Sequence, residues 1–298
     1  RSGGLMRYVR ANDLWAAGSG PPGPPDLAPA LGTWFNCNRD TGEIVRLELA
    51  ARDGALVLRA FGAGEPAGID WGETPTVPHV SSLSSREVAG FTARYDFDFM
   101  ETQIAANLKY GVLVIQSYNR VRDDSGRPCY FTREFFHQDR AAAPPASPPP
   151  PAGAAAELPH RMAGDRPAVA PGPGGGIVDL SPWLGRWHNT NRDSKGIRSV
   201  VLSRRGDEFF VHAAGVGCDA DWGAVPAIPH AAGVSSATPE GFLARYDFGF
   251  SEVLLSANVA KGLLIIASFA TFRDGSGRSS YFTREFFHRE LAGTESPP

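Results

Sequence analysis

The sequence predicts an all-β protein made of two tandem antiparallel meander β-barrels, with seven or eight strands in each. Two observations predict this fold: the same blocks of sequence occur twice in the same order, and apolar and polar residues alternate along many segments. A length of 298 residues suits two domains of ordinary size. No long amphipathic helix is predicted.

The duplication rests on four sequence blocks. In the first copy they occupy residues 31–40, 70–72, 90–99 and 130–137, and they recur at 184–193, 221–223, 241–250 and 281–288. The offset is 153 residues for the first block and 151 for the others, so two residues are lost after the first block. Collinear blocks at a nearly constant offset indicate a tandem duplication.

Composition suggests the domain boundaries. We predict an N-terminal arm (1–26), a first barrel (27–138), a Pro/Ala/Gly-rich linker (139–178), a second barrel (179–291) and a C-terminal tail (292–298). The linker holds too few apolar residues to offset the entropy lost on ordering it, which is typical of a flexible connection. Within the arm, residues 6–15 are expected to form a short helix or an extended arm.

Alternation identifies the central strand of each copy. Between Phe91 and Phe99 every odd position is apolar or aromatic and every even position is polar, so this strand has one aromatic and one polar face. After the opening block, further strands are predicted at 43–50, 54–61, 100–108, 111–122 and 128–137. Residues 72–90 are expected to be a longer connection, with a short helical turn at 84–88.

Tight turns between consecutive strands indicate a meander. A long meander hides its unpaired edges most economically by closing into a barrel. With about eight strands, the interior has room for side chains or for one small ligand.

The opening residues of each copy, Leu31–Asn36 and Leu184–Trp187, resemble the Gly-x-Trp start of the first strand in calycins, the superfamily of lipocalin and avidin-like barrels. The resemblance implies an internal ligand cavity but no specific chemistry. It also implies that the Trp closes one end of the barrel and that a late arginine, Arg133 or Arg284, packs across it. Asn36 corresponds to an avidin residue that touches the ligand, but no other part of a biotin site is visible.

The three cysteines lack the spacing of a zinc site or a redox motif. Cys37 lies on the first predicted strand and Cys129 on the last, and these strands become neighbours when a barrel closes. The alternatives are a Cys37–Cys129 contact or disulfide, and three small buried thiols including Cys218.

Charge and motifs exclude several functions. A net charge of −3 argues against a nucleic acid or an anionic membrane as partner. No run of about 20 apolar residues is present. The first six residues lack the apolar core of a signal peptide, so a cytoplasmic location is expected. No nucleotide, flavin, zinc or nucleophile motif occurs, so we predict no cofactor and no metal.

The polar face of the central strand supplies the candidate catalytic residues. They are Arg94, Asp96 and Glu101 in the first copy and Arg245, Asp247 and Glu252 in the second. If the aromatic face packs outward, these groups line the lumen as an acid–base pocket. If the aromatic face fills the lumen, they form a solvated, ion-paired outer face.

Candidate ligand-binding residues are the aromatic, amide and acidic side chains of the predicted rims and strand faces. They are Asn36, Asp70, Trp71, Tyr95, Asn107, Asn189, Asp221, Trp222, Tyr246 and Asn258. A rim Trp beside a carboxylate can stack on a sugar and hydrogen-bond to it. The alternative is a Trp that caps the core.

Three functions are compatible with these features. The first is a small-molecule-binding barrel, as a carrier or as a cofactor-independent cyclase or isomerase of a hydrophobic metabolite in the lumen. The second is a bivalent carbohydrate-binding module, and the third is a non-catalytic structural or interaction protein. The expected partners are a small molecule and the other barrel of the same chain, and a homodimer is left open. The copies diverge at Phe35, Glu73 and Gln116, so function is best sought where they differ.

Overall fold

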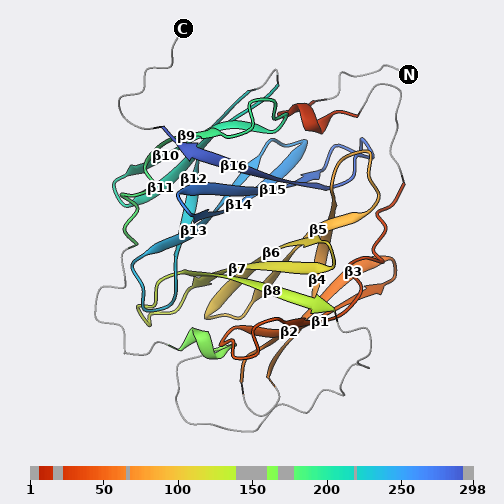
Figure 1. Ribbon diagram of the computed structural model, residues 1–298, viewed down its shortest axis with the longest axis vertical. Coiled ribbons are helices and arrows are strands. Elements are labelled where there is room, and N and C mark those ends of the chain that lie inside the picture. The colour runs from red at the N-terminus through yellow and green to blue at the C-terminus, as the bar shows by residue number, and fades with distance from the viewer. Residues whose placement is uncertain are drawn as a thin grey trace.

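The computed structural model of the protein describes residues 7–15, 23–64, 68–138, 160–166, 178–217 and 220–290 (Figure 1). The predicted all-β class is confirmed, because the regular elements of these residues are strands apart from two short 3-10 turns, η1 (Ala11–Asp13) and η2 (Ala163–Asp165). Within the described part of the chain, no helix is long and apolar enough to cross a membrane.

Each copy contributes eight described strands. In the first copy these are β1 (Gly32–Asn36), β2 (Ile44–Arg52), β3 (Ala55–Gly62), β4 (Ile69–Val80), β5 (Val88–Asp96), β6 (Met100–Lys109), β7 (Val112–Val121) and β8 (Tyr130–Gln138). In the second copy these are β9 (Gly185–Asn189), β10 (Ile197–Arg205), β11 (Glu208–Gly215), β12 (Asp221–Ala231), β13 (Pro239–Asp247), β14 (Ser251–Ala260), β15 (Leu263–Phe272) and β16 (Tyr281–Arg289).

Strand pairing closes each copy into a ring. Consecutive strands pair in chain order, and the first strand of each copy also pairs with the last. Asn36 of β1 lies opposite Phe136 of β8, and Asn189 of β9 lies opposite Phe287 of β16. Closure gives every described strand two neighbours, which removes exposed edges. In Figure 1 the first ring, orange to yellow, lies below the second ring, green to blue.

The register of β1 on β8 separates the two cysteines. The backbone N–H of Cys37 donates to Phe135 O at 2.8 Å. Cys129 comes six residues earlier, about 20 Å along an extended strand, and both thiols are free. Of the two alternatives, the Cys37–Cys129 contact is not formed, because adjacent strands do not bring together residues at different heights. Neither thiol is fully buried, since Cys37 is exposed and Cys129 is half-buried. Cys218 lies outside the described residues.

The predicted connection at 72–90 is wrong. Residues 72–80 belong to the twelve-residue strand β4, and β5 begins at Val88, so the connection is only residues 81–87 and contains no helical turn. The strand contains Pro75 and Pro78, although proline lacks the N–H that a central strand normally donates. The strand tolerates both, with Pro75 opposite Val57 and Pro78 opposite Phe91.

Apolar side chains pack in the interior of each ring. The first cluster includes Trp34, Leu47, Leu58, Phe91 and Ile104, and the second includes the equivalent residues Trp187, Val200, Val211, Phe242 and Leu255. The aromatic face of β5 therefore points inward. The Tyr95 hydroxyl donates to Leu58 O at 3.1 Å inside this core. Of the two alternatives for the central strand, the structure has the aromatic face inside and the polar face outside.

A short segment before the first repeat closes one end of the second ring. We call residues 8–15, which include η1, the N-terminal plug. Trp222 Nε1 donates to Val9 O at 3.3 Å, and the Tyr281 hydroxyl donates to Asp13 Oδ1 at 2.6 Å. Figure 1 shows η1, in red, beside the upper ring.

The linker supplies the matching segment for the first ring. We call residues 160–166, which include η2, the linker plug. Trp71 Nε1 donates to Arg161 O at 2.9 Å, and the Tyr130 hydroxyl donates to Asp165. The two plugs thus make the same contacts at positions 152 residues apart. Each plug precedes one repeat and closes the ring of the other, which ties the copies together.

The exchange of plugs extends the sequence predictions. The expected short helix or arm at 6–15 is present as a 3-10 turn within the described residues. The predicted linker lies largely outside the described residues, but its residues 160–166 pack on the first ring, which its composition did not indicate.

The two rings pack on each other with approximate two-fold symmetry. Val80 N donates to Ser280 O at 3.0 Å, and the equivalent Ala231 N donates to Cys129 O at 2.8 Å. Two edge-to-face ring contacts, His79 with Phe269 and Tyr118 with His230, repeat the symmetry, each with centroids 5.1 Å apart.

Tyr118 breaks this symmetry, because the equivalent Phe269 has no hydroxyl. The Tyr118 hydroxyl lies 2.9 Å from Ser256 Oγ and donates to Ala257 O at 3.0 Å, both across the interface.

We expect Tyr118→Phe to lower the free energy of unfolding by about 1–2 kcal/mol, because buried partners lose their hydrogen bonds. Urea unfolding measures this. Tyr110→Phe, at a side chain that is 91% exposed, is the control and should change nothing. Equal stabilities of Tyr118→Phe and the parent would contradict the prediction.

Candidate functional site

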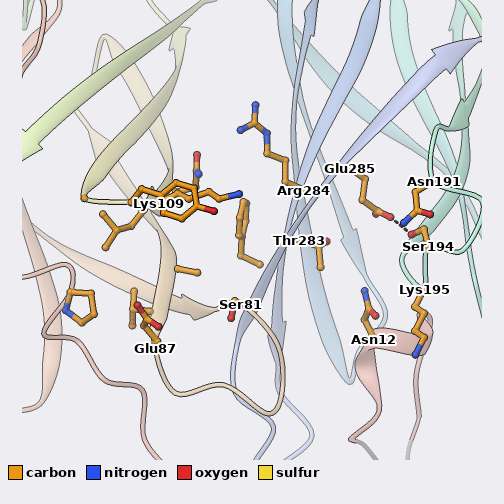
Figure 2. Close-up of a pocket in the computed structure, with 18 of the residues that line it drawn as sticks. Asn12, Ser81, Glu87, Lys109, Asn191, Ser194, Lys195, Thr283, Arg284 and Glu285 are labelled. Carbon is orange, nitrogen blue, oxygen red and sulfur yellow. Dashed lines mark hydrogen bonds between the residues drawn. The ribbon is translucent and has the colours of Figure 1, made fainter.

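A cleft of about 960 Å³ lies between the two rings. We call it the inter-repeat cleft. One wall comes from the first ring and includes Ser81, Glu87, Asn107, Lys109 and Tyr110. The other comes from the second ring and the N-terminal plug and includes Asn12, Asn191, Lys195, Thr283 and Glu285. Figure 2 shows Lys109 and Glu87 on one side, Asn12 and Lys195 on the other, and Thr283 between them.

The β6–β7 hairpin presents an aromatic side chain to the cleft. Its two turn residues, Tyr110 and Gly111, both have positive φ, 53° and 75°, as a type I′ turn requires. Such a turn matches the twist of the flanking strands, so the hairpin tip has a defined direction. Tyr110 is 91% exposed, and Lys109 Nζ lies 5.1 Å from the centre of its ring.

Glu285 of β16 organises the opposite wall. Its carboxylate accepts hydrogen bonds from Asn189 Nδ2 at 2.8 Å and Ile197 N at 3.0 Å, and from the Ser194 hydroxyl. These bonds fix the loop that connects β9 to β10. The loop in turn carries Lys195 to the cleft, where Lys195 O accepts from the backbone N–H of Asn12 at 3.3 Å.

Several polar groups of the cleft have no hydrogen-bond or ion-pair partner among the described side chains. The hydroxyl oxygen of Thr283 is buried without a partner. The side chains of Asn12, Glu87, Asp193 and Lys195 likewise form no hydrogen bond or ion pair with the described part of the chain. The cleft has balanced charge: Lys109, Lys195 and Arg284 against Glu87, Asp193 and Glu285. The cleft therefore offers free hydrogen-bond donors and acceptors together, and its positive and negative side chains are equal in number.

Some residues that line the cleft are identical in the two copies of the repeat, and others are not. Its scaffold, such as Thr283 and Glu285, has identical counterparts in Thr132 and Glu134. Asp193 likewise matches Asp40, but five other free polar residues have no identical counterpart. Asn12, Ser81, Glu87, Lys109 and Lys195 correspond to Gly164, Ala232, Thr238, Ala260 and Gly42. The copies therefore diverge at this cleft.

The predicted catalytic residues lie on the outer face, which is the second of the two arrangements that the sequence left open. Arg94 and Asp96 are 55% and 53% exposed, and Arg94 Nη2 lies 2.9 Å from Glu101 Oε2. In the second copy Arg245 pairs with Glu252 and Arg273 pairs with Asp247. The physical reason is the aromatic face, whose burial turns the alternate side chains outward. Their catalytic role stays a prediction.

Four of these six residues nevertheless come together. Arg94, Glu101, Arg245 and Glu252 line a second groove between the rings, separate from the inter-repeat cleft. Sequence reasoning identified the residues but not the surface they share.

The predicted rim tryptophans are core residues. Trp71 and Trp222 are 7% and 8% exposed, and the plugs cover them. The carboxylate of Asp70 pairs with Arg59, and Asp221 contacts His212 Nε2 at 2.5 Å. Rim sites open for sugar stacking are therefore not formed by these tryptophans.

The remaining predicted ligand-binding residues divide between structural positions and the cleft. Asn36 Nδ2 donates to Ile44 O at 2.8 Å, and Asn189 Nδ2 donates to Ile197 O at 2.7 Å, so both hold a turn. Asn258 accepts from Gln116 Nε2 at 2.9 Å within the ring interface. Tyr246 donates to Val211 O at 2.8 Å in the core.

Asn107 is the one predicted ligand-binding residue of that set that lines the inter-repeat cleft. Sequence reasoning missed Asn12, Glu87, Lys109 and Lys195. The signal that could have found them is divergence between the copies, which was noted at other positions. The late arginines, implied by resemblance to pack across the Trp, instead lie over neighbouring phenylalanines: Arg133 over Phe135 and Arg284 over Phe286.

Comparison with models of known families and with curated proteins finds no match. Among solved structures, the chain shows a weak likeness to one described as "Structural insights into dehydratase substrate selection for the borrelidin and fluvirucin polyketide synthases". The two are 14% identical with a TM-score of 0.12, over 86% of this chain and 98% of that one. A TM-score this low carries no argument about fold or function. The resemblance to calycins stays a prediction.

Proposed function

We propose that the protein binds a neutral saccharide, or a similarly hydroxyl-rich small molecule, in the inter-repeat cleft. The observation that carries the proposal is a set of free polar side chains that have no identical counterpart in the other copy: Asn12, Ser81, Glu87, Lys109 and Lys195. Sugar hydroxyls both donate and accept hydrogen bonds, so they can satisfy amides, carboxylates and ammonium groups together. The balanced charge of the cleft favours a neutral ligand over an anion.

The exposed ring of Tyr110 supports the same class of ligand. A solvated aromatic ring at the tip of a defined hairpin offers an apolar face that a ligand can cover. The apolar face of a pyranose ring can stack on such a surface while its hydroxyls reach polar neighbours. The cleft volume of about 960 Å³ accommodates more than one sugar ring.

In this proposal each ring is a calycin-like barrel that serves as scaffold. The interiors are lined by packed apolar side chains, so the support for an acid–base pocket in the lumen is lost, and with it the support for a cyclase or isomerase acting there. Carbohydrate binding is retained from the sequence hypotheses, but at one site between the rings rather than at two tryptophan rims.

The test exchanges free cleft residues for their own counterparts. The variant carries Asn12→Gly, Ser81→Ala, Lys109→Ala and Lys195→Gly, residues that the equivalent positions already tolerate. Binding of glucose, galactose, N-acetylglucosamine and cellotriose is measured by ligand-observed NMR and calorimetry. We expect at least one sugar to bind the parent, and the variant to bind it at least about tenfold more weakly, a loss of about 1.4 kcal/mol.

The matched control is Lys261→Ala, on the equivalent hairpin of the second copy (Ala260–Lys261 against Lys109–Tyr110). It should leave sugar binding unchanged. The proposal is overturned if none of the four sugars binds the parent protein, or if the four-residue variant binds as well as the parent.

A further inference from the structure

The second groove between the rings has a different chemistry from the inter-repeat cleft. It has a volume of about 610 Å³ and shares no lining residue with the cleft. Strands β4 to β7 form one wall and β12 to β15 form the other. Equivalent arginines, Arg94 and Arg245, enter it from the two copies. We call it the arginine groove.

The lining of the arginine groove holds more arginines than carboxylates, although Asp96 and Asp247 beside it also pair with Arg94 and Arg273. Four arginines line it, namely Arg94, Arg120, Arg245 and Arg273, against two glutamates, Glu101 and Glu252. Each glutamate already pairs with an arginine of its own copy. Arg120 forms no ion pair with any side chain in the described part of the chain. An unneutralised guanidinium in a concave site favours a bound anion.

Like charges from the two copies approach each other here. Burial lowers the pKa of Arg245, and the charges of Arg94 and Arg273 lower it further. Arg245 Nη2 also reaches Gln103 of the first copy at 3.5 Å, which shows that its side chain extends across the interface. An anion between Arg94 and Arg245 would relieve their mutual repulsion.

The arginine groove also has apolar lining residues, and the two copies contribute them unequally. Gln103 and Arg120 of the first copy correspond to Leu254 and Thr271 of the second. The second copy therefore presents an apolar wall. Its apolar lining residues are Ile228, Leu243, Leu254 and Phe269. A ligand that satisfies both walls must have a charged end and an apolar body.

We propose that the arginine groove binds an organic carboxylate with an apolar body. The carboxylate lies among Arg94, Arg120 and Arg245, since guanidinium groups match carboxylates in charge and planar geometry. The apolar body packs on Leu243, Leu254 and Phe269. This site is independent of the saccharide site, because the two cavities have no residue in common.

The test uses three probes that separate the charged and apolar contributions. Octanoate has both parts, acetate has only the carboxylate, and 1-octanol has only the apolar chain. Binding to the full-length protein is measured by calorimetry and by NMR of the protein amides. We expect octanoate to bind at least tenfold more tightly than either acetate or 1-octanol.

Variants then locate the site. Arg94→Gln and Arg245→Gln should each weaken octanoate binding at least tenfold, and Leu254→Gln, which copies the residue of the first repeat, should weaken octanoate but not acetate. Arg39→Gln, at an exposed arginine outside the groove, should have no effect. The proposal is overturned if octanoate does not bind, if 1-octanol binds as tightly as octanoate, or if both arginine variants bind octanoate like the parent. Sugar binding is measured on the same variants and should be unchanged.

Discussion

Replacing Arg10 with methionine is expected to stabilise the protein by about 1–3 kcal/mol, the usual cost of burying donors that have no hydrogen-bond partner. Arg10 of the N-terminal plug is 0% exposed, and its three guanidinium nitrogens have no hydrogen-bond partner among the described groups. Its charge is compensated by Asp13 at 3.5 Å and by the rings of Tyr281 at 4.9 Å and Trp222 at 5.8 Å. Burial lowers the pKa of Arg10, but the charges of Tyr281, Asp13 and Glu285 raise it above its usual value. What the site lacks is hydrogen-bond partners for the buried donors, and that lack is costly.

In the linker plug, an apolar residue occupies the position equivalent to Arg10. Met162 occupies the position of Arg10 there, is 0% exposed and belongs to the core of the first ring. Asp165, the counterpart of Asp13, still accepts from Tyr130 and from its own plug without such an arginine. Arg10→Met therefore copies an arrangement that the same fold already uses.

Equilibrium unfolding in urea measures the change, and Arg39→Met, at an exposed site, is the control that should leave stability unchanged. A loss of stability in Arg10→Met would contradict the prediction. It would indicate that the buried guanidinium is satisfied by a bound anion or by water inside the second ring.

Replacing Glu43 with glutamine is expected to remove a large pH dependence of stability. Burial, together with the nearby carboxylates of Glu134 and Asp165, raises the pKa of Glu43 to about 8. The Glu43 Oε2 atom has no hydrogen-bond partner in the described structure. A Cβ added at Gly164 of the linker plug would lie 2.0 Å from Glu43 Oε1, so the plug itself buries the carboxyl group.

The sign follows from the direction of the shift. The folded pKa of Glu43 lies above its usual value of 4.5, so between these two values the folded state holds a proton that the unfolded state has released. The contribution of this carboxyl group to stability is greatest below about pH 4.5 and is lost as the pH rises through about 8. A shift of this size corresponds to a loss on the order of 3–5 kcal/mol over that window.

We therefore expect Glu43→Gln to match the parent near pH 4.5 and to exceed it in stability at pH 8. Urea unfolding of both proteins from pH 4.5 to 8.5 measures the difference, which isolates Glu43. The buried His79 and His230, whose lowered pKa values act in the opposite sense, are common to both proteins. Glu208→Gln, at an exposed site, is the control. The prediction would be contradicted if the free energies of unfolding of parent and variant differed by the same amount at every pH.

Local patterns predicted much of the fold. The alternation in Phe91–Phe99 placed β5 correctly to within three residues at either end, because side chains on opposite faces of a strand show directly in sequence. Residues 72–80 form a strand although Pro75 and Pro78 are a strong local signal against one, because pairing with β3 and β5 overrides that signal. Local propensity is a weak guide where neighbouring strands supply most of the contacts.

The candidate site was predicted less well, and for a different reason. Asn12, Glu87, Lys109 and Lys195 meet in one cleft although they are far apart in the chain. None belongs to a motif, since each acts through its position relative to the others. Arg94, Glu101, Arg245 and Glu252 were identified from the polar face of one strand, but the groove that they share forms only when the two rings pack together.

The duplication, the all-β class and most of the hairpins follow from local sequence patterns, because repetition and two-residue periodicity are properties of neighbouring residues. Three features depend instead on tertiary packing: which strand face is buried, which ring each plug closes, and where the copies meet. These depend on burying the largest apolar area across segments distant in the chain. A strand such as Phe91–Phe99 has the same alternation whichever way it faces. Only the packing of Trp34, Leu58 and Phe91 in one core turned its arginine and aspartate outward, toward the second copy and the solvent.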